Sequence, residues 1–124
     1  MTKVFLVARY LLVLMLIVFG LNKFLGFLPD PGYLPLSKAF IYMGALGSVH
    51  MFQALGIIYL ASAAALLANK FVGLVCVTLA AIDINILLFH LNLDTANIAP
   101  AIVLTVLLAI NMLANSSKLT GLLR

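Results

Sequence analysis

The stretch AAIDINILLFHLNLD, residues 80–94, decides the fold class of this chain. Most of its residues are large and apolar, yet Asp83, Asn85, His90 and Asp94 interrupt the run. Such polar groups are costly in hydrocarbon, so they normally face the interior of a helix bundle or a wet cavity. The stretch therefore predicts a membrane helix that carries a polar site.

The rest of the chain has the same apolar character. Of its 124 residues, 66% are hydrophobic and 8% charged, and the mean hydropathy is +1.30. A soluble domain carries about 25% charged residues. The net charge of +4 comes from scattered basic residues without interleaved aromatics, which argues against a nucleic-acid partner. Cys76 is the single cysteine, which excludes an intramolecular disulfide and predicts a small packing residue.

We predict an all-α integral membrane protein, an antiparallel four-transmembrane-helix bundle forming one domain over residues 1–124. About 20 apolar residues are needed to cross the hydrocarbon. The four apolar runs that come near this length cover about residues 4–27, 47–67, 71–91 and 98–114. The first run lacks a cleavage pattern and is interrupted by Arg9, so we interpret it as a retained helix rather than a signal peptide.

The connections support this topology. The first contains the turn signal Pro29-Asp30-Pro31-Gly32, and residues 36–43 are expected to form a short interfacial helix. The second is only residues 68–70, and the third is residues 92–97, with Pro100 in the first turn of the last helix. Short connections make neighbouring helices antiparallel.

The basic residues predict the orientation. Five lie near the side of both termini (Lys3, Arg9, Lys70, Lys118 and Arg124), whereas Lys23 and Lys38 belong to the other side. Cytoplasmic segments carry the excess of lysine and arginine. Both termini are therefore expected in the cytoplasm of a bacterial cell, with the bundle in the inner membrane.

The polar residues of the third run share one face. His90 follows Asp83 by seven residues, which is within about 20° of two full turns. Asp94 stays close to the same line if the helix continues that far, and Asn85 lies to one side. We expect these groups to form a stripe that climbs from the middle of the membrane to its outer side.

Other helices bring polar groups to the same outer depth. Asn22 and Lys23 stand near the end of the first helix, and His50 and Gln53 are three residues apart near the start of the second. The predicted ligand-binding pocket is therefore lined by Asn22, Lys23, His50, Gln53, Asp83, Asn85, His90 and Asp94. Toward the other end, Asn111 and Asn115 are expected at the depth of Arg9.

Structural roles compete with each of these assignments. Asp83 also fits an interhelical hydrogen bond, and Lys23 also fits a side chain that reaches for the membrane surface. His50 and His90 also fit simple placement near the membrane interface, and Arg9 is interpreted as an anchor or an inner-leaflet lipid contact rather than a catalytic group. His50 and His90 make an incomplete metal site, so neither metal nor haem is expected. Small pairs such as Ala61 and Ala65 favour close helix packing, within the bundle or across a homodimer.

Several of these residues resemble the DoxX family of small four-helix bacterial membrane proteins. The similarity rests on Arg9, on FGLNKFLGFLP at residues 19–29, and on NILLFHLNLD at residues 85–94. Within these motifs the matching positions are Arg9, Gly20, Asn22, Lys23, Asn85, His90 and Asp94. Many members of that family carry a glutamate early in the second span, and this chain has Gln53 at about that place.

The resemblance implies a redox-associated membrane subunit that faces a quinone, and it does not imply a catalytic centre in this chain, whose sequence shows no obvious redox group. The first hypothesis is accordingly binding of a quinone or another small amphipathic ligand, and whether turnover accompanies it stays open. The alternative is a non-enzymatic partner that docks or stabilises another membrane or periplasmic protein. A transporter of protons or lipid-like solutes is a third hypothesis, although the halves show no inverted repeat.

Overall fold

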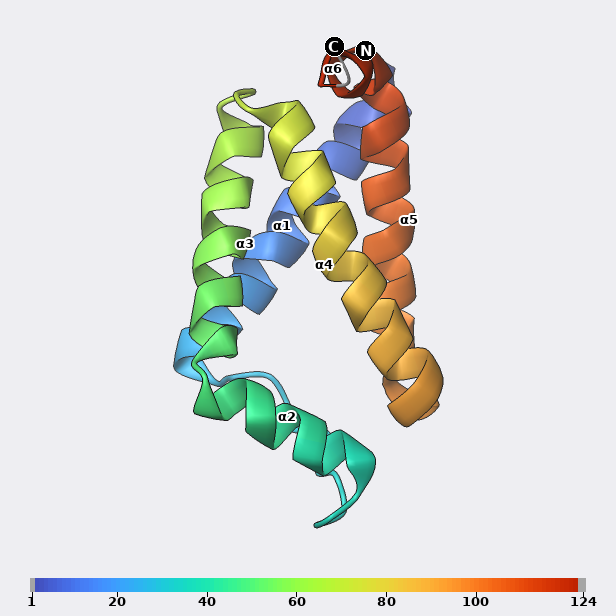
Figure 1. Cartoon of the computed structure of the whole chain (residues 1–124). Helices are drawn as coiled ribbons and strands as arrows, with labels where there is room; N and C mark the ends of the chain where they lie inside the picture. The colour runs from blue at the N-terminus through green and yellow to red at the C-terminus, as the bar shows by residue number, and fades with distance from the viewer. Residues whose placement is uncertain (1, 123–124) are drawn as a thin grey trace.

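The computed structural model describes residues 2–122, which form helices joined by loops, with no β-strand in that range (Figure 1). This confirms the all-α prediction. The helices are α1 (Lys3–Leu25), α2 (Lys38–Ser48), α3 (Met51–Leu67), α4 (Val72–Leu93), the short 3-10 helix η1 (Thr95–Asn97), α5 (Ala99–Ala114) and α6 (Ser116–Gly121).

Two helices, α1 and α4, are long and apolar enough to cross a membrane. The consecutive helices α2 and α3 would make a third span if they are counted as one span that is broken by a 75° bend. The range of α5 agrees with the fourth predicted run, but its 16 residues are fewer than a full crossing needs. The described residues are consistent with a membrane protein.

Local signals explain most of the helix ends. Ser37 caps α2 by accepting a hydrogen bond from the Phe40 amide at 3.2 Å. Gly26 ends α1 in the left-handed region, with φ of 62°, a conformation that glycine adopts without steric cost. Pro100 occupies the first turn of α5, as predicted.

The second predicted run begins later than expected. The short helix expected at residues 36–43 forms, but it starts at Lys38 and continues through Gly47 to Ser48. The Ser48 hydroxyl donates to the Ala45 carbonyl at 2.7 Å, and His50 turns the chain with a left-handed φ of 58°. As a result, His50 lies at the break rather than inside the second helix.

The end of α4 also corrects the expected polar stripe. The helix stops at Leu93, and Asp94 is extended with φ of −157°. Asp94 therefore does not continue the helical line that joins Asp83 to His90. The 3-10 helix η1 and then α5 follow directly after Asp94.

The helices pack in an order that differs from their order in the chain. Helix α1 packs along α3 and also contacts α5, while α4 packs on α5 and contacts α3 only sparsely. Figure 1 shows α3 and α4 diverging from their short connection at the end where both termini lie, with α2 crossing the opposite end. The diverging helices leave the α2 end more open than the terminal end.

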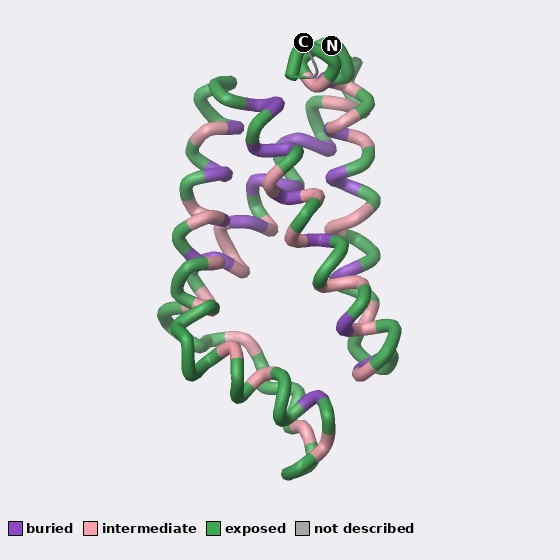
Figure 2. Tube along the Cα trace, viewed as in Figure 1, coloured by how far each residue is buried: buried purple, intermediate pink, exposed green. Residues whose placement is uncertain are grey.

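The packed core occupies the terminal half of the molecule (Figure 2). Its largest fully buried side chains include Leu12, Leu16, Leu66 and Cys76. Cys76 is thus a buried packing residue, as predicted. Toward α2, the facing apolar side chains surround a cavity instead of meeting one another.

Two glycines allow the close contact between α1 and α3. A β-carbon on Gly20 would stand 3.0 Å from Leu60, and one on Gly56 would stand 2.6 Å from the Phe24 ring and 3.0 Å from the Lys23 β-carbon. Of the predicted pair Ala61 and Ala65, Ala61 is exposed and Ala65 is partly buried against the core. Gly20 and Gly56 are the positions where the close approach of α1 and α3 leaves no room for a side chain.

Replacing Gly56 with leucine is expected to destabilise the fold by about 2 kcal/mol, because the new side chain must displace α1. Unfolding of the purified protein in detergent measures this loss. Gly44→Ala is the matched control, since a β-carbon there meets nothing within 4 Å and alanine favours a helix. Equal stability of Gly56→Leu and the wild type would contradict the tight α1–α3 contact.

Candidate functional site

A cavity of about 810 Å³ lies between the diverging helices at the α2 end. Side chains from α1 to α5 line it, together with the first connection, and most of them are apolar. Its aromatic and methionine residues include Phe19, Tyr42, Met43, Phe52 and Tyr59. Ligand sites for small molecules have this combination of size and apolar lining with a few polar groups.

Of the eight residues predicted to form the pocket, the structure brings four together on this cavity: Asn22, Lys23, Asn85 and His90. Lys23 is the most distinctive of them. Its Nζ lies 5.5 Å from the centre of the Phe52 ring, and no carboxylate among residues 2–122 lies within 4.0 Å of it. The cavity therefore contains a cationic donor without an anionic partner.

His90 supplies the complementary acceptor. Its Nδ1 lies 3.0 Å from the Asp94 backbone oxygen. A carbonyl oxygen only accepts, so Nδ1 carries the proton in this contact and the Nε2 of the neutral ring is left as an acceptor. The neighbouring Phe89 packs edge-on against this imidazole, with centroids 5.1 Å apart.

Asn22 and Asn85 have local hydrogen bonds. The Asn22 side-chain oxygen accepts from the Leu28 amide at 2.8 Å, which fixes the chain as it leaves α1. Asn85 donates to the Ala81 carbonyl one turn earlier, at 3.0 Å. Both residues therefore shape the cavity wall while their backbone contacts use part of their hydrogen-bonding capacity.

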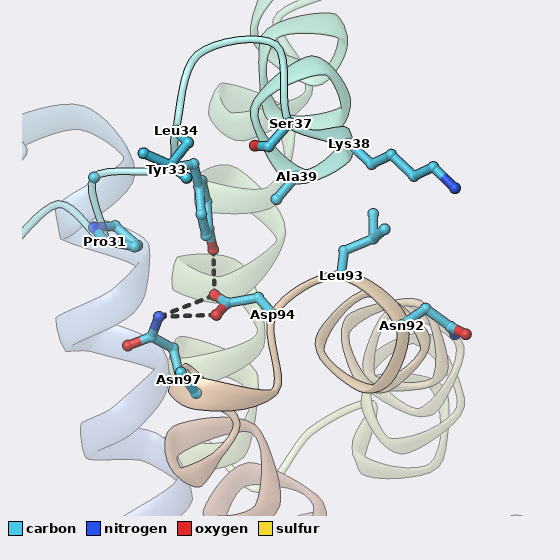
Figure 3. A pocket seen from close by; sticks show the side chains of 12 residues that line it. Pro31, Tyr33, Leu34, Ser37, Lys38, Ala39, Asn92, Leu93, Asp94 and Asn97 are labelled. Carbon is cyan, nitrogen blue, oxygen red and sulfur yellow. Dashed lines mark hydrogen bonds between the residues drawn. The ribbon is translucent and has the colours of Figure 1, made fainter.

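Asp94 belongs to a neighbouring polar cluster that ties the first connection to the end of α4. Its carboxylate accepts a hydrogen bond from the Tyr33 hydroxyl at 2.5 Å and two from the Asn97 side chain, at 2.9 and 3.1 Å. Figure 3 shows these three side chains pointing toward one another. They line a second hollow of about 620 Å³, and Asp94 is only 9% exposed.

Aromatic contacts also hold the first connection and α2 against the end of α4; this set of contacts, with the Tyr33–Asp94–Asn97 cluster, is called the closure below. The rings of Tyr42 and Phe89 stack with centroids 5.0 Å apart, which joins α2 to α4. Tyr33 meets Phe89 edge-on at 6.0 Å. The first connection and α2 are therefore fastened across the α2 end of the cavity.

The Tyr33 hydroxyl makes this closure sensitive to alkaline pH. Burial raises the pKa of Tyr33 above its ordinary value of 10.0, and the hydrogen bond to Asp94 raises this pKa further. The folded state thus favours the neutral phenol, and its stabilising contribution is intact below pH 10.0 and lost as the pH rises above that value. Stability measured between about pH 8 and 11 should fall more steeply in the wild type than in Tyr33→Phe. Parallel curves would contradict this role.

Asp83 does not line the cavity and is buried between α4 and α5. It is 5% exposed and lies outside the cavity lining. Its oxygens stand 3.0 and 2.9 Å from the Thr105 hydroxyl, which is itself 2.8 Å from the Ala101 carbonyl. This geometry is that of an interhelical hydrogen bond, one of the two roles that the sequence left open.

His50 and Gln53 do not reach the cavity. Both are exposed, and neither is among the lining residues. The left-handed backbone at His50 removes it from the helical face that it was expected to share with Gln53. The two histidines consequently do not face a common site, and within residues 2–122 no three His, Cys, Asp or Glu side chains gather in a way that could hold a metal ion.

Arg9 is buried and forms a cross-link between helix ends. It is 7% exposed, and it donates to Asn69 at 3.0 Å and to Asn115 at 3.1 Å. Arg9 and Asn115 were expected at one depth, and the structure brings them into contact. Arg9 therefore anchors the start of α1 to other helix ends of the same chain.

Sequence reasoning missed three partners, namely Thr105, Tyr33 and Asn69. Thr105 is the single hydroxyl residue within α5, which was a usable signal because such a group in an apolar helix seeks a partner. Nothing in the proline-rich first connection singled out Tyr33. Asn69 has a left-handed φ of 54°, which asparagine tolerates better than most residues.

Comparison of the chain with protein-family models, curated proteins and solved structures finds no match.

Proposed function

We propose that this chain is a DoxX-type protein of the bacterial inner membrane, with α1, α3, α4 and α5 crossing the membrane and both termini in the cytoplasm. Exposed apolar side chains on the two shorter helices support this placement, because water is a poor solvent for them. Examples are Ile57 and Leu67 on α3, and Ile102 and Val106 on α5. Local thinning of the bilayer accommodates spans shorter than the hydrocarbon.

Its function, we infer, is to bind a quinone or a related amphipathic ring in the 810 Å³ cavity, as an accessory subunit of a redox system. The observation that carries this proposal is the pairing of a cationic donor, Lys23, with the acceptor nitrogen of His90 on one mostly apolar cavity, where no carboxylate among residues 2–122 lies within 4.0 Å of Lys23. Apolar walls suit the ring and its tail, and the two polar groups suit its oxygens.

The chemistry of the two residues fits both redox states of such a ligand. Lys23 donates a hydrogen bond to a carbonyl or phenolate oxygen, while the His90 Nε2 accepts one from a hydroxyl. The Asp94 backbone oxygen holds the His90 tautomer in this role. No bond to the ligand is formed or broken in this binding step.

Calorimetric titration of the purified protein with a short-chain benzoquinone and its quinol tests the proposal. Lys23→Met is expected to weaken binding of the quinone, and His90→Leu binding of the quinol, by about tenfold or more, because each removes one polar contact in an apolar site. Asp83→Asn is the matched control, since Asp83 lies outside the lining and should leave affinity unchanged. Circular dichroism verifies that each variant folds.

Affinity that is unchanged in folded Lys23→Met and His90→Leu would refute the ligand proposal. So would an equal loss in Asp83→Asn, because that pattern reports a general loosening of the bundle.

A second candidate function is docking to another membrane or periplasmic protein. It is favoured by four strongly apolar side chains around the start of α2, of which Leu34 is 77% and Leu36 84% exposed, with Phe40 and Ile41 beside them. Native mass spectrometry of protein released gently from its own membranes separates the two proposals. A bound redox lipid supports the first, and a stoichiometric protein partner supports the second.

A further inference from the structure

The start of α1, the turn between α3 and α4, and α6 lie at one end of the molecule (Figure 1), and these segments are rich in basic residues. Lys3, Arg9, Lys70 and Lys118 belong to this end. The three aspartates of the chain lie in the first connection, within α4 and directly after it. No carboxylate among residues 2–122 lies within 4.0 Å of Arg9 or Lys118.

Two cations at this end share one neutral oxygen. The Asn69 side-chain oxygen accepts from Arg9 at 3.0 Å and from Lys118 at 3.2 Å. Asn115 supplies a second neutral oxygen to Arg9, while the buried Arg9 Nε has no partner within the described part of the chain. Amide oxygens satisfy hydrogen bonds but cancel no charge, so a local excess of positive charge remains among the described residues of this end.

The backbone holds this arrangement in place. Asn69 occupies a left-handed position in the short turn between α3 and α4. Helix α6 lies close to the start of α4, where a β-carbon on Gly73 would stand 3.2 Å from the Lys118 carbonyl oxygen. Packed backbone therefore fixes where the Asn69 and Lys118 side chains start, and Arg9 is itself buried.

We propose that the corner formed by Arg9, Asn69 and Lys118, with the exposed Lys70 in the same turn as Asn69, binds a phosphate group, and that an anionic lipid headgroup supplies it. Basic pockets between helices on the cytoplasmic side recognise such headgroups. Lys118 and Lys70 are exposed and contact the phosphate, while Arg9 adds its charge from behind. The lipid source rests on the proposed membrane placement, whereas the phosphate chemistry does not rest on the proposed quinone cavity.

Purified full-length protein in neutral detergent is titrated with phosphatidylglycerol, phosphatidylcholine and inorganic phosphate, and the melting temperature and bound lipid are recorded. Phosphatidylglycerol is expected to bind and to raise the melting temperature, and phosphatidylcholine to do neither. Lys118→Gln should weaken binding of phosphatidylglycerol about fivefold, since one lysine near an anionic surface contributes about 1 kcal/mol. Lys70→Gln is a second variant that keeps every hydrogen bond described above.

Lys38→Gln is the matched control, because it removes the same charge from an exposed site at the opposite end. Equal weakening by Lys38→Gln and Lys118→Gln, or equal stabilisation by phosphatidylcholine, would overturn the proposal. Stabilisation by inorganic phosphate that Lys118→Gln weakens supports the phosphate site and assigns it to a soluble source. Extraction of the wild type from membranes at alkaline pH tests the membrane placement separately.

Discussion

Asn115→Leu is expected to destabilise the protein by about 3 kcal/mol. The substitution removes one of the two acceptors of the Arg9 guanidinium and the bond from Asn115 to the Asn111 carbonyl, at a position only 3% exposed. Breaking a hydrogen bond to a buried charge costs more than breaking a neutral one, because a donor of the buried charged group is left without its acceptor. Chemical unfolding in detergent measures the loss.

Two further variants test whether the stability loss in Asn115→Leu comes from its contact with Arg9. Asn92→Leu also removes a bond to the carbonyl one turn earlier, but Asn92 is exposed and has no arginine partner; a change below about 0.5 kcal/mol is expected. Adding Arg9→Met to Asn115→Leu should recover part of the loss, because the buried guanidinium that lost one of its two acceptors is gone. Strictly additive effects of Arg9→Met and Asn115→Leu would contradict the coupling.

Asp94→Ala is expected to release the first connection and α2 from the end of α4. The carboxylate is the shared acceptor of the Tyr33 hydroxyl and the Asn97 amide, so its removal leaves two donors without their partner. We expect a loss of about 2 kcal/mol. Faster amide hydrogen exchange over residues 37–48 should accompany it, because this segment makes few other contacts with the core.

Asp30→Ala is the matched control for Asp94→Ala. Asp30 lies in the same connection and carries the same charge, but it is exposed and accepts only from the nearby Gly32 amide at 2.9 Å. Little change in exchange over residues 37–48 is expected. If both variants increased exchange equally, the closure would depend on the charge of this region and not on the Tyr33–Asp94–Asn97 cluster.

Much of the helical framework was predictable because its signals are local. The apolar runs, Gly26 after α1 and Pro100 in α5 each act through neighbouring residues. The break before α3 was not predicted, since it depends on a hydroxyl bond from Ser48 and an uncommon backbone conformation at His50. Neither feature carries a strong pattern in the sequence.

The candidate site was predictable in part. Lys23 and His90 were expected on one pocket, and both line the cavity, because their depths followed from distance along their helices. Asp83 was placed correctly along α4, but its depth left open whether it faced a ligand or another helix. Its separation from the cavity depends on how α4 is rotated against α5.

The sequence by itself determined that the chain is apolar and helical, where most helices end, and which few polar groups must be accommodated. Only the tertiary structure decided their partners: Asp83 meets Thr105 22 positions away, Tyr33 meets Asp94 across 61, and Arg9 meets Asn115 across 106. Helical propensity acts within about one turn, whereas these pairings depend on how distant segments pack, with α4 on α5 for Asp83 and α1 against α5 for Arg9. The cavity depends in addition on the divergence of α3 from α4. That divergence converts apolar helix faces into the walls of a cavity.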